Sequence, residues 1–250
     1  GLIGNKIQGD LGCIIEINSE TDFVSRNEIF QNFVKNCSLL ALKSDGNIET
    51  LNKMKYLNTD NSVEEELTKN IATIGENLNI RRIEYIKLDD EGLIVSYIHN
   101  SVTENLGKIG VLIALKSKAD KMILMDLGKK IAMQIAATNP QSINIKNLNI
   151  DLVDKERSIL IEQALSSGKP REIAEKMVEG RIKKYYEEVV LEEQTFIIDG
   201  KSKVKEIINE FSISTGHEIE IYDFKKLVLG EGINVEEKDF VAEVAATAQQ

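Results

Sequence analysis

The sequence predicts an α+β fold made of two similar units, each a β-hairpin followed by a helix. The first hairpin passes through the turn residues Gln8-Gly9-Asp10 into the apolar stretch Cys13-Ile14-Ile15, and a helical pattern follows. Setting Gly12 against Gly110 aligns that stretch with Val111-Leu112-Ile113, again with a hairpin before it and a helix after it. The repeated order of elements indicates two units packed side by side.

The first unit contains two helical patterns, the first of them directly after the hairpin, and a third strand. Apolar residues recur at helical spacing over one stretch, with Gly46 as its stop. Residues 62–78 predict another helix, and alternation from Ile80 to Leu88 predicts the third strand. The apolar stripe of the first helix consists of Phe30, Phe33, Val34, Cys37, Leu40 and Ala41.

The second unit repeats this plan with its last strand displaced along the chain. Residues 93–98 and 109–115 predict the hairpin strands, joined through the turn Asn105-Leu106-Gly107. A helix from about residue 120 stops at Asn139-Pro140. Residues 218–229 alternate like a strand and are expected to complete the second three-stranded antiparallel sheet.

Helical patterns fill the segment between the two parts of the second unit. One runs over about residues 153–167 and ends at Gly168, and Pro170 suits the first turn of the next. We expect that next helix to pair with the helix bearing Val204 and Phe211, after a break at Asp199-Gly200. The two would form an antiparallel hairpin that projects from the body. A short amphipathic helix over residues 238–245 is expected to close the chain.

These patterns divide the chain into five parts. We expect a core N-subdomain at 1–90, a core C-subdomain at 91–169 and 212–232, a helical hairpin insertion at 170–211, and a C-terminal helical module at 233–250. The chain opens with Gly1 and goes straight into strand-like sequence, so we expect it to be part of a longer product.

Composition argues against several classes of function. The formal net charge is -10, from 31 basic and 41 acidic residues, which does not suit nucleic acid as the main ligand. The longest apolar stretches are of strand length, so no membrane span is expected. The two histidines, His99 and His217, have no partner at metal-ligand spacing, and no nucleophile–base signature can be assembled. We therefore expect no metal, no cofactor and no enzymatic activity.

One short segment, Thr21-Asp22-Phe23-Val24, is a candidate binding site. Ser25 and Glu28 have the spacing of a capping box, and Val24 and Ile29 that of a hydrophobic staple, which gives Val24 a structural role. Phe23 has no such role: an apolar side chain between strand and helix, beside the carboxylate of Asp22, suits an interface anchor. The alternative is that Phe23 folds back onto the sheet edge while Asp22 stabilises the helix N-terminus.

Five segments, taken in order, resemble bacterial and organellar elongation factor Ts, the guanine-nucleotide exchange factor for elongation factor Tu. They contain the strings Thr21-Asp22-Phe23-Val24, Ile74-Gly75-Glu76-Asn77 and Asp239-Phe240-Val241-Ala242, and they cover nearly the whole chain. Each segment is weak evidence by itself, but five in the family's order are very specific. The matching segments are residues 16–24, 74–82, 131–137, 167–181 and 239–246.

The resemblance implies a partner, a mechanism and contact residues. It implies two three-stranded subdomains, a protruding hairpin and a C-terminal helix, without the family's N-terminal ubiquitin-associated-like domain. The segment at Asp22 and Phe23 would enter the GTPase domain of elongation factor Tu, in its GDP-bound or nucleotide-free form, near magnesium. Contacts of Met133, Gln134 and Phe240 are implied with less support. Many relatives have histidine at Gln134, and burial explains Met133 and Gln134 nearly as well.

Two other classes of function stay open at this point. One is a scaffold or dimerisation module, in which the helical hairpin makes a homodimer. The other is a small-molecule enzyme with a pocket between the subdomains. The resemblance favours the exchange factor, acting in the cytoplasm during translation elongation and contacting neither nucleic acid nor membrane directly.

Overall fold

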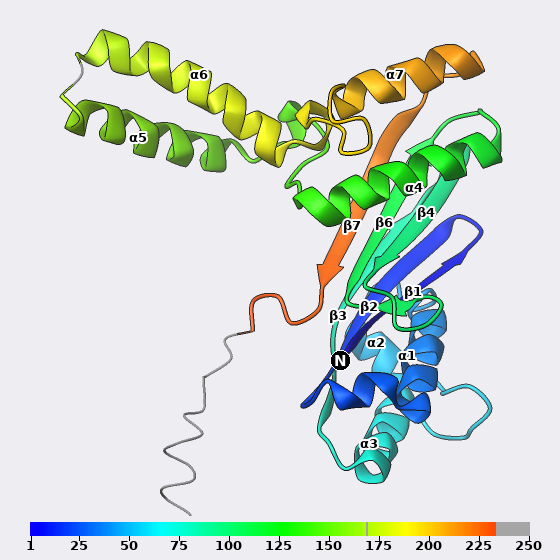
Figure 1. The fold of residues 1–250 in the computed structure, drawn as a ribbon. Helices are drawn as coiled ribbons and strands as arrows, with labels where there is room; N and C mark the ends of the chain where they lie inside the picture. Colours follow the sequence, from blue (N-terminus) through cyan, green and yellow to red (C-terminus); the bar gives the residue numbers. More distant parts are fainter. Residues whose placement is uncertain (169, 234–250) are drawn as a thin grey trace, which may run out of the picture.

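The fold is a stack of layers in which two antiparallel sheets face each other and helices cover their outer faces (Figure 1). The computed structural model describes residues 1–168 and 170–233. It confirms the α+β class. The expected C-terminal helix, residues 238–245, lies outside the described residues.

The first sheet is built on the predicted hairpin. Strand β1 (Leu2–Gln8) pairs with β2 (Leu11–Ser19), which pairs with β3 (Leu78–Lys87). A fourth, two-residue strand, β5 (Leu106–Gly107), adds to the free edge of β1, giving the order β3-β2-β1-β5. In sequence this strand belongs to the second unit. By pairing with β1 it links the second unit to the edge of the first sheet.

The second sheet has the three expected strands. Strand β4 (Gly92–His99) pairs with β6 (Ile109–Lys116), and β6 pairs with β7 (Glu220–Val228), all antiparallel. Strand β7 returns from about a hundred residues further along the chain, as its alternating sequence predicts.

The central strands are apolar on both faces because each is covered on both sides. On β2, Cys13 and Ile15 face the helices, whereas Ile14 faces the other sheet. On β6, Ile113 faces the helices and Leu112 the other sheet. An apolar cluster between the sheets therefore unites the two units: Ile3, Ile14, Ile86, Leu88, Ile94, Leu112, Ala114 and Leu227.

Three helices cover the outer face of the first sheet. They are α1 (Glu28–Ala41), α2 (Ile48–Lys53) and α3 (Val63–Ile74). The apolar stripe predicted for α1 is buried in the core beneath it. The sequence did not predict α2, which is too short to show a period and begins at the N-cap Asn47.

Two helices cover the second sheet. Helix α4 (Lys121–Thr138) ends where Asn139 takes a left-handed conformation before Pro140, and α7 (Val204–Thr215) lies beside it. Val204 and Ile208 of α7 are buried in the core under α4.

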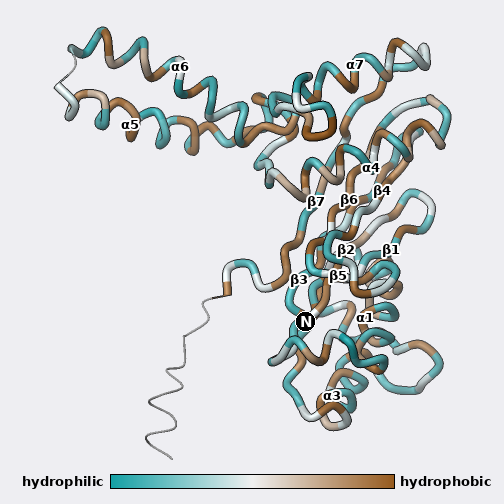
Figure 2. The backbone as a smooth tube through the Cα atoms, viewed as in Figure 1, coloured by the Kyte–Doolittle hydropathy of each residue, from teal (hydrophilic) through white to brown (hydrophobic). Residues whose placement is uncertain are grey.

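The projecting hairpin is formed by α5 (Ile150–Ser166) and α6 (Arg171–Val189), so the prediction that α6 pairs with α7 is wrong (Figure 1). The connection from α5 to α6 is short, whereas residues 190–203 separate α6 from α7, and short connections favour antiparallel neighbours. Val178 and Ile182 of α6 pack with Leu160 of α5. In Figure 2 hydrophobic and hydrophilic residues alternate along both helices, as expected when each helix buries only the face that meets the other.

The base of this hairpin is fixed to the body. Gln141 N–H donates to Val189 O at 2.7 Å, and Leu191 N–H donates to Ser142 O at 2.9 Å. Short 3₁₀ turns flank this base at η2 (Ile145–Asn147) and η3 (Leu191–Glu193).

Candidate partner-binding loop

The TDFV loop, Thr21-Asp22-Phe23-Val24, lies between the end of β2 and the start of α1. A 3₁₀ turn, η1 (Phe23–Arg26), connects the two elements. Phe23 is 85% exposed, whereas its neighbour Val24 is 5% exposed and packs in the first core. The alternative in which Phe23 folds back onto the sheet is therefore wrong. The loop presents one aromatic ring to solvent, directly before a buried anchor.

The capping box predicted at Ser25 and Glu28 is wrong. Helix α1 has Asn27 as its N-cap, whose side chain accepts from the backbone N–H groups of Ile29 at 2.9 Å and Phe30 at 3.2 Å. Ser25 lies inside the 3₁₀ turn, where its hydroxyl donates to Asp22 O at 2.6 Å. The unpredicted turn moves the N-cap two residues along the chain, from Ser25 to Asn27. Val24 therefore does not take the staple position and packs in the first core instead.

Two charged side chains from outside the loop hold it at adjacent residues, Thr21 and Asp22. The carboxylate of Glu76 accepts from Thr21 N–H at 2.8 Å and from the Thr21 hydroxyl at 2.5 Å. Lys108 Nζ donates to Asp22 Oδ1 at 2.9 Å. The hydrogen bond from Thr21 lowers the pKa of Glu76, and the hydrogen bond from Lys108 lowers the pKa of Asp22. Both carboxylates are therefore charged at neutral pH.

A buried carboxylate lies on β2, the strand that leads into the loop. Glu16 is fully buried, and it accepts from Arg81 at 3.0 Å, from Arg82 Nε at 2.6 Å and from the backbone N–H of Gly230 at 2.9 Å. Burial by itself raises the pKa of Glu16, but these hydrogen bonds outweigh burial and leave that pKa below its usual range.

The two arginines extend this network to the end of β7. Arg81 Nη2 donates to Glu231 O at 2.6 Å, and Arg82 Nη2 donates to Val228 O at 2.8 Å. The network ties β2, β3 and the end of β7 together. Sequence reasoning gave these residues no role, although a glutamate inside the apolar run of β2 was a usable signal, because buried carboxylates need paired donors.

The remaining candidate contact residues differ in accessibility. Met133 is 39% exposed on α4. Its neighbour Gln134 is fully buried, donates to Gln194 Oε1 at 3.0 Å and to Thr195 O at 3.1 Å, and accepts from Ile197 N–H at 2.8 Å. Of the two roles considered for Gln134, burial and not partner contact therefore fits, because its side chain exposes no surface in this structure. Phe240 lies outside the described residues.

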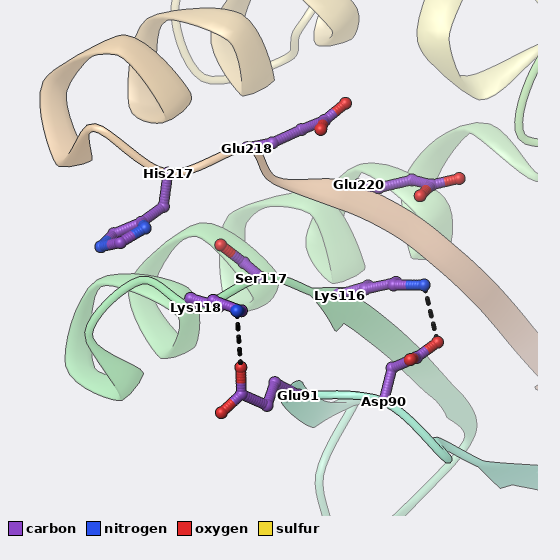
Figure 3. A pocket seen from close by; sticks show the side chains of 8 residues that line it. All are labelled: Asp90, Glu91, Lys116, Ser117, Lys118, His217, Glu218 and Glu220. Carbon is purple, nitrogen blue, oxygen red and sulfur yellow. Dashed lines mark ion pairs between the residues drawn. The ribbon is translucent and has the colours of Figure 1, made fainter.

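A surface hollow of about 340 Å³ lies at the end of the second sheet (Figure 3). Another, of about 440 Å³, lies between the two units, with Gly9 and Asp10 on one side and Leu93 and Ile94 on the other. In the hollow at the end of the second sheet, Lys116 pairs with Asp90 at 2.7 Å and Lys118 with Glu91 at 3.8 Å, and Glu218 and Glu220 leave the lining with an excess of negative charge. Such exposed pairs are typical of a solvated surface. Ser117 and His217 both line this hollow, but no hydrogen bond joins the hydroxyl of one to the ring of the other.

Within residues 1–168 and 170–233, no group of three or more His, Cys, Asp or Glu side chains is arranged to hold a metal ion. None of the helices in these ranges is both long enough and apolar enough to span a bilayer.

A family model and individual relatives both match this chain over most of its length. The sequence model of the family described as Elongation factor TS matches residues 20–231. Proteins named Elongation factor Ts from Rhodospirillum centenum, Rhodospirillum rubrum and Parvibaculum lavamentivorans are 45%, 47% and 46% identical to this chain. These alignments cover 99%, 98% and 100% of this chain and 80% of each relative.

Proposed function

Because this chain belongs to the elongation factor Ts family, we propose that it binds elongation factor Tu and accelerates the release of GDP from it. Family membership makes the chain a translation elongation factor, and we place its action in the cytoplasm. Exchange of this kind makes and breaks no covalent bond in the factor.

The observation that carries the proposal is the exposure of Phe23 next to a residue, Val24, that is fixed in the core. Phe23 is 85% exposed, so it buries little surface in the free chain, while Val24 next to it is buried in the core. An exposed aromatic side chain on a fixed backbone is typical of an interface anchor. Filling a pocket of the partner with this ring would stabilise the complex by about 2–3 kcal/mol.

In the proposed mechanism Phe23 enters the GTPase domain as a wedge beside the magnesium site. Asp22, 91% exposed at its side chain, brings a negative charge to the same place. Magnesium is among the largest local charges in a nucleotide site, so disturbing its coordination removes a principal counter-charge from the GDP phosphates. Factor and GDP then weaken each other's binding by the same factor, as linkage requires.

Further contacts belong to the same proposal. The second subdomain meets the C-terminal β-domain of elongation factor Tu, and the segment around Phe240 meets the GTPase domain. On α4, Met133 supplies contact surface, since Gln134 next to it is buried.

A mixing experiment tests the proposal. Fluorescent GDP bound to elongation factor Tu is chased with unlabelled nucleotide, with and without this chain. We expect release to accelerate with increasing concentration of the chain and to saturate. Unchanged release at micromolar chain would overturn the proposal. A gain in sedimentation mass of this chain alone, without accelerated release, would favour a dimerisation module.

A further inference from the structure

Glu76 was part of a matching sequence segment, yet the proposed mechanism gives it no task. It lies in the turn between α3 and β3, directly after Gly75, which ends α3 with a left-handed backbone (φ 81°). This turn brings the Glu76 carboxylate to Thr21, fifty-five residues earlier in the chain. Both carboxylate oxygens are used on the single residue Thr21, one for its N–H and one for its hydroxyl.

The contacts of Glu76 lie at the surface, so their contribution to global stability is small. Their local effect is larger, because Thr21 directly precedes the two residues proposed to meet the partner. The Thr21 carbonyl is also held, by the hydroxyl of Ser19 at 2.8 Å. Thr21 is thus held by three hydrogen bonds, two on its backbone and one on its hydroxyl, at a place where loops are usually mobile.

Lys108 holds the TDFV loop at Asp22, from the short connection between the two sheets. It lies between β5 and β6, and its backbone is fixed to the second unit: its N–H donates to His99 O at 3.2 Å and its carbonyl accepts from Leu229 N–H at 2.9 Å. Its ammonium group reaches across to Asp22 at 2.9 Å. The loop of the first unit is therefore supported by the second unit as well.

We propose that Glu76 and Lys108 are positioning residues that hold the TDFV loop in its partner-binding shape before the partner arrives. The inference rests on the proposed exchange function. Ordering a free loop on binding costs affinity, and fixing it beforehand removes that cost. Glu76 acts through Thr21, and Lys108 acts through Asp22. Neither needs to touch the partner.

The first test measures the loop in the free chain. Hydrogen exchange of the Thr21 amide is followed in the unaltered chain, in Glu76→Gln and in Glu76→Ala. We expect protection to fall in that order, because a glutamine oxygen still accepts one of the two hydrogen bonds. Equal protection in all three chains would overturn the proposal, since Glu76 would not fix the loop.

The second test measures exchange. We expect Glu76→Ala to raise the concentration for half-maximal GDP release about tenfold, as the loss of two modest hydrogen bonds implies, with little change in the maximal rate. Lys108→Met should raise it about threefold, in line with an exposed ion pair. The matched controls are Glu64→Ala, an exposed glutamate at the other end of α3, and Lys118→Met, an ion-paired lysine at the other end of β6. Both should match the unaltered chain.

A double-mutant cycle separates positioning from direct contact. If Glu76 acts only through the loop, Glu76→Ala should add little once Phe23→Ala has removed the wedge. Full additivity of the two losses would overturn the inference and make Glu76 a contact residue. Exchange by Glu76→Ala and Lys108→Met equal to that of the unaltered chain would overturn the inference alone. No exchange by the unaltered chain would overturn the proposed function and this inference with it.

Discussion

Gly12 and Gly110 are reciprocal across the interface between the two sheets. A Cβ atom on Gly12 would lie 2.9 Å from Ile94 Cγ2, which belongs to the second sheet. A Cβ atom on Gly110 would lie 2.6 Å from Ile3 Cγ2, which belongs to the first. Each glycine leaves the space that a branched side chain of the opposite sheet fills. The repeat in the sequence is thus a repeat of packing as well.

Substituting either glycine is expected to destabilise the fold. Gly12→Ala and Gly110→Ala should each lower the free energy of unfolding by about 1–3 kcal/mol, the usual effect of overpacking a core. Denaturant titration measures this. Gly180→Ala is the control: Gly180 is exposed inside α6 and a Cβ there meets nothing within 4 Å. It should raise stability by about 0.5–1 kcal/mol. Equal stability of all three variants would show that the sheets separate more easily than this packing implies.

The order of elements was predictable because each hairpin carries its own signals. Turn residues such as Gly9 and Asn105, and the spacing of apolar residues on α1, are local in sequence. The reciprocal fit of Gly12 and Gly110 was not predictable, because nothing near Gly12 says that Ile94 will lie opposite it. The pairing of α6 was mispredicted for a different reason. Both α5 and α7 offer apolar stripes, and the short connection between α5 and α6 is the local signal that favours α5.

The candidate site also has parts that the sequence predicts and parts that it does not. The exposure of Phe23 was predictable, because the local pattern gives this residue no structural role. The cap at Asn27 did not, because Ser25 and Glu28 match a capping box equally well and a 3₁₀ turn decides between them. The anchors Glu76 and Lys108 come from segments 55 and 86 residues away, so no local pattern predicts them.

Glu16 gives the fold a measurable pH dependence. Its pKa is lowered in the folded chain, so its contribution to stability is full above the unfolded pKa of about 4.3 and is lost as pH falls through the folded value. Glu16→Gln should cost about 3 kcal/mol at pH 7, because it removes the buried carboxylate that Arg81 and Arg82 share and leaves Arg82 only its longer ion pair with Glu231, at 3.5 Å. The stability of this variant should also fall less steeply on acidification.

The control for that substitution is Glu84→Gln, a half-buried glutamate on the neighbouring strand β3. Unfolding would be measured by circular dichroism from pH 7 to pH 3. If Glu16→Gln followed the same pH dependence as the unaltered chain, the hydrogen-bonded network would not be the source of the acid sensitivity.

Gln134 is expected to affect stability and not partner binding. Gln134→Leu keeps the apolar bulk but leaves Ile197 N–H and Thr195 O without their partner, at a cost of about 1–3 kcal/mol. Met133→Ala, on the adjacent exposed position, should change stability by less than about 0.5 kcal/mol and weaken binding to elongation factor Tu modestly. Weaker binding by folded Gln134→Leu, with its stability unchanged, would contradict the buried assignment.

Phe23 and Val24 form the sharpest matched pair, since adjacent residues are assigned opposite roles. Phe23→Ala removes a side chain that buries little surface in the free chain, so the melting temperature should hardly change. Exchange should weaken by the equivalent of about 2–3 kcal/mol, the expected contribution of an aromatic ring in a pocket. Val24→Ala removes core methyl groups and should lower stability by about 1–2 kcal/mol. Its folded fraction should still exchange nucleotide normally. Earlier melting of Phe23→Ala with normal exchange would assign the ring to the core and reject the wedge.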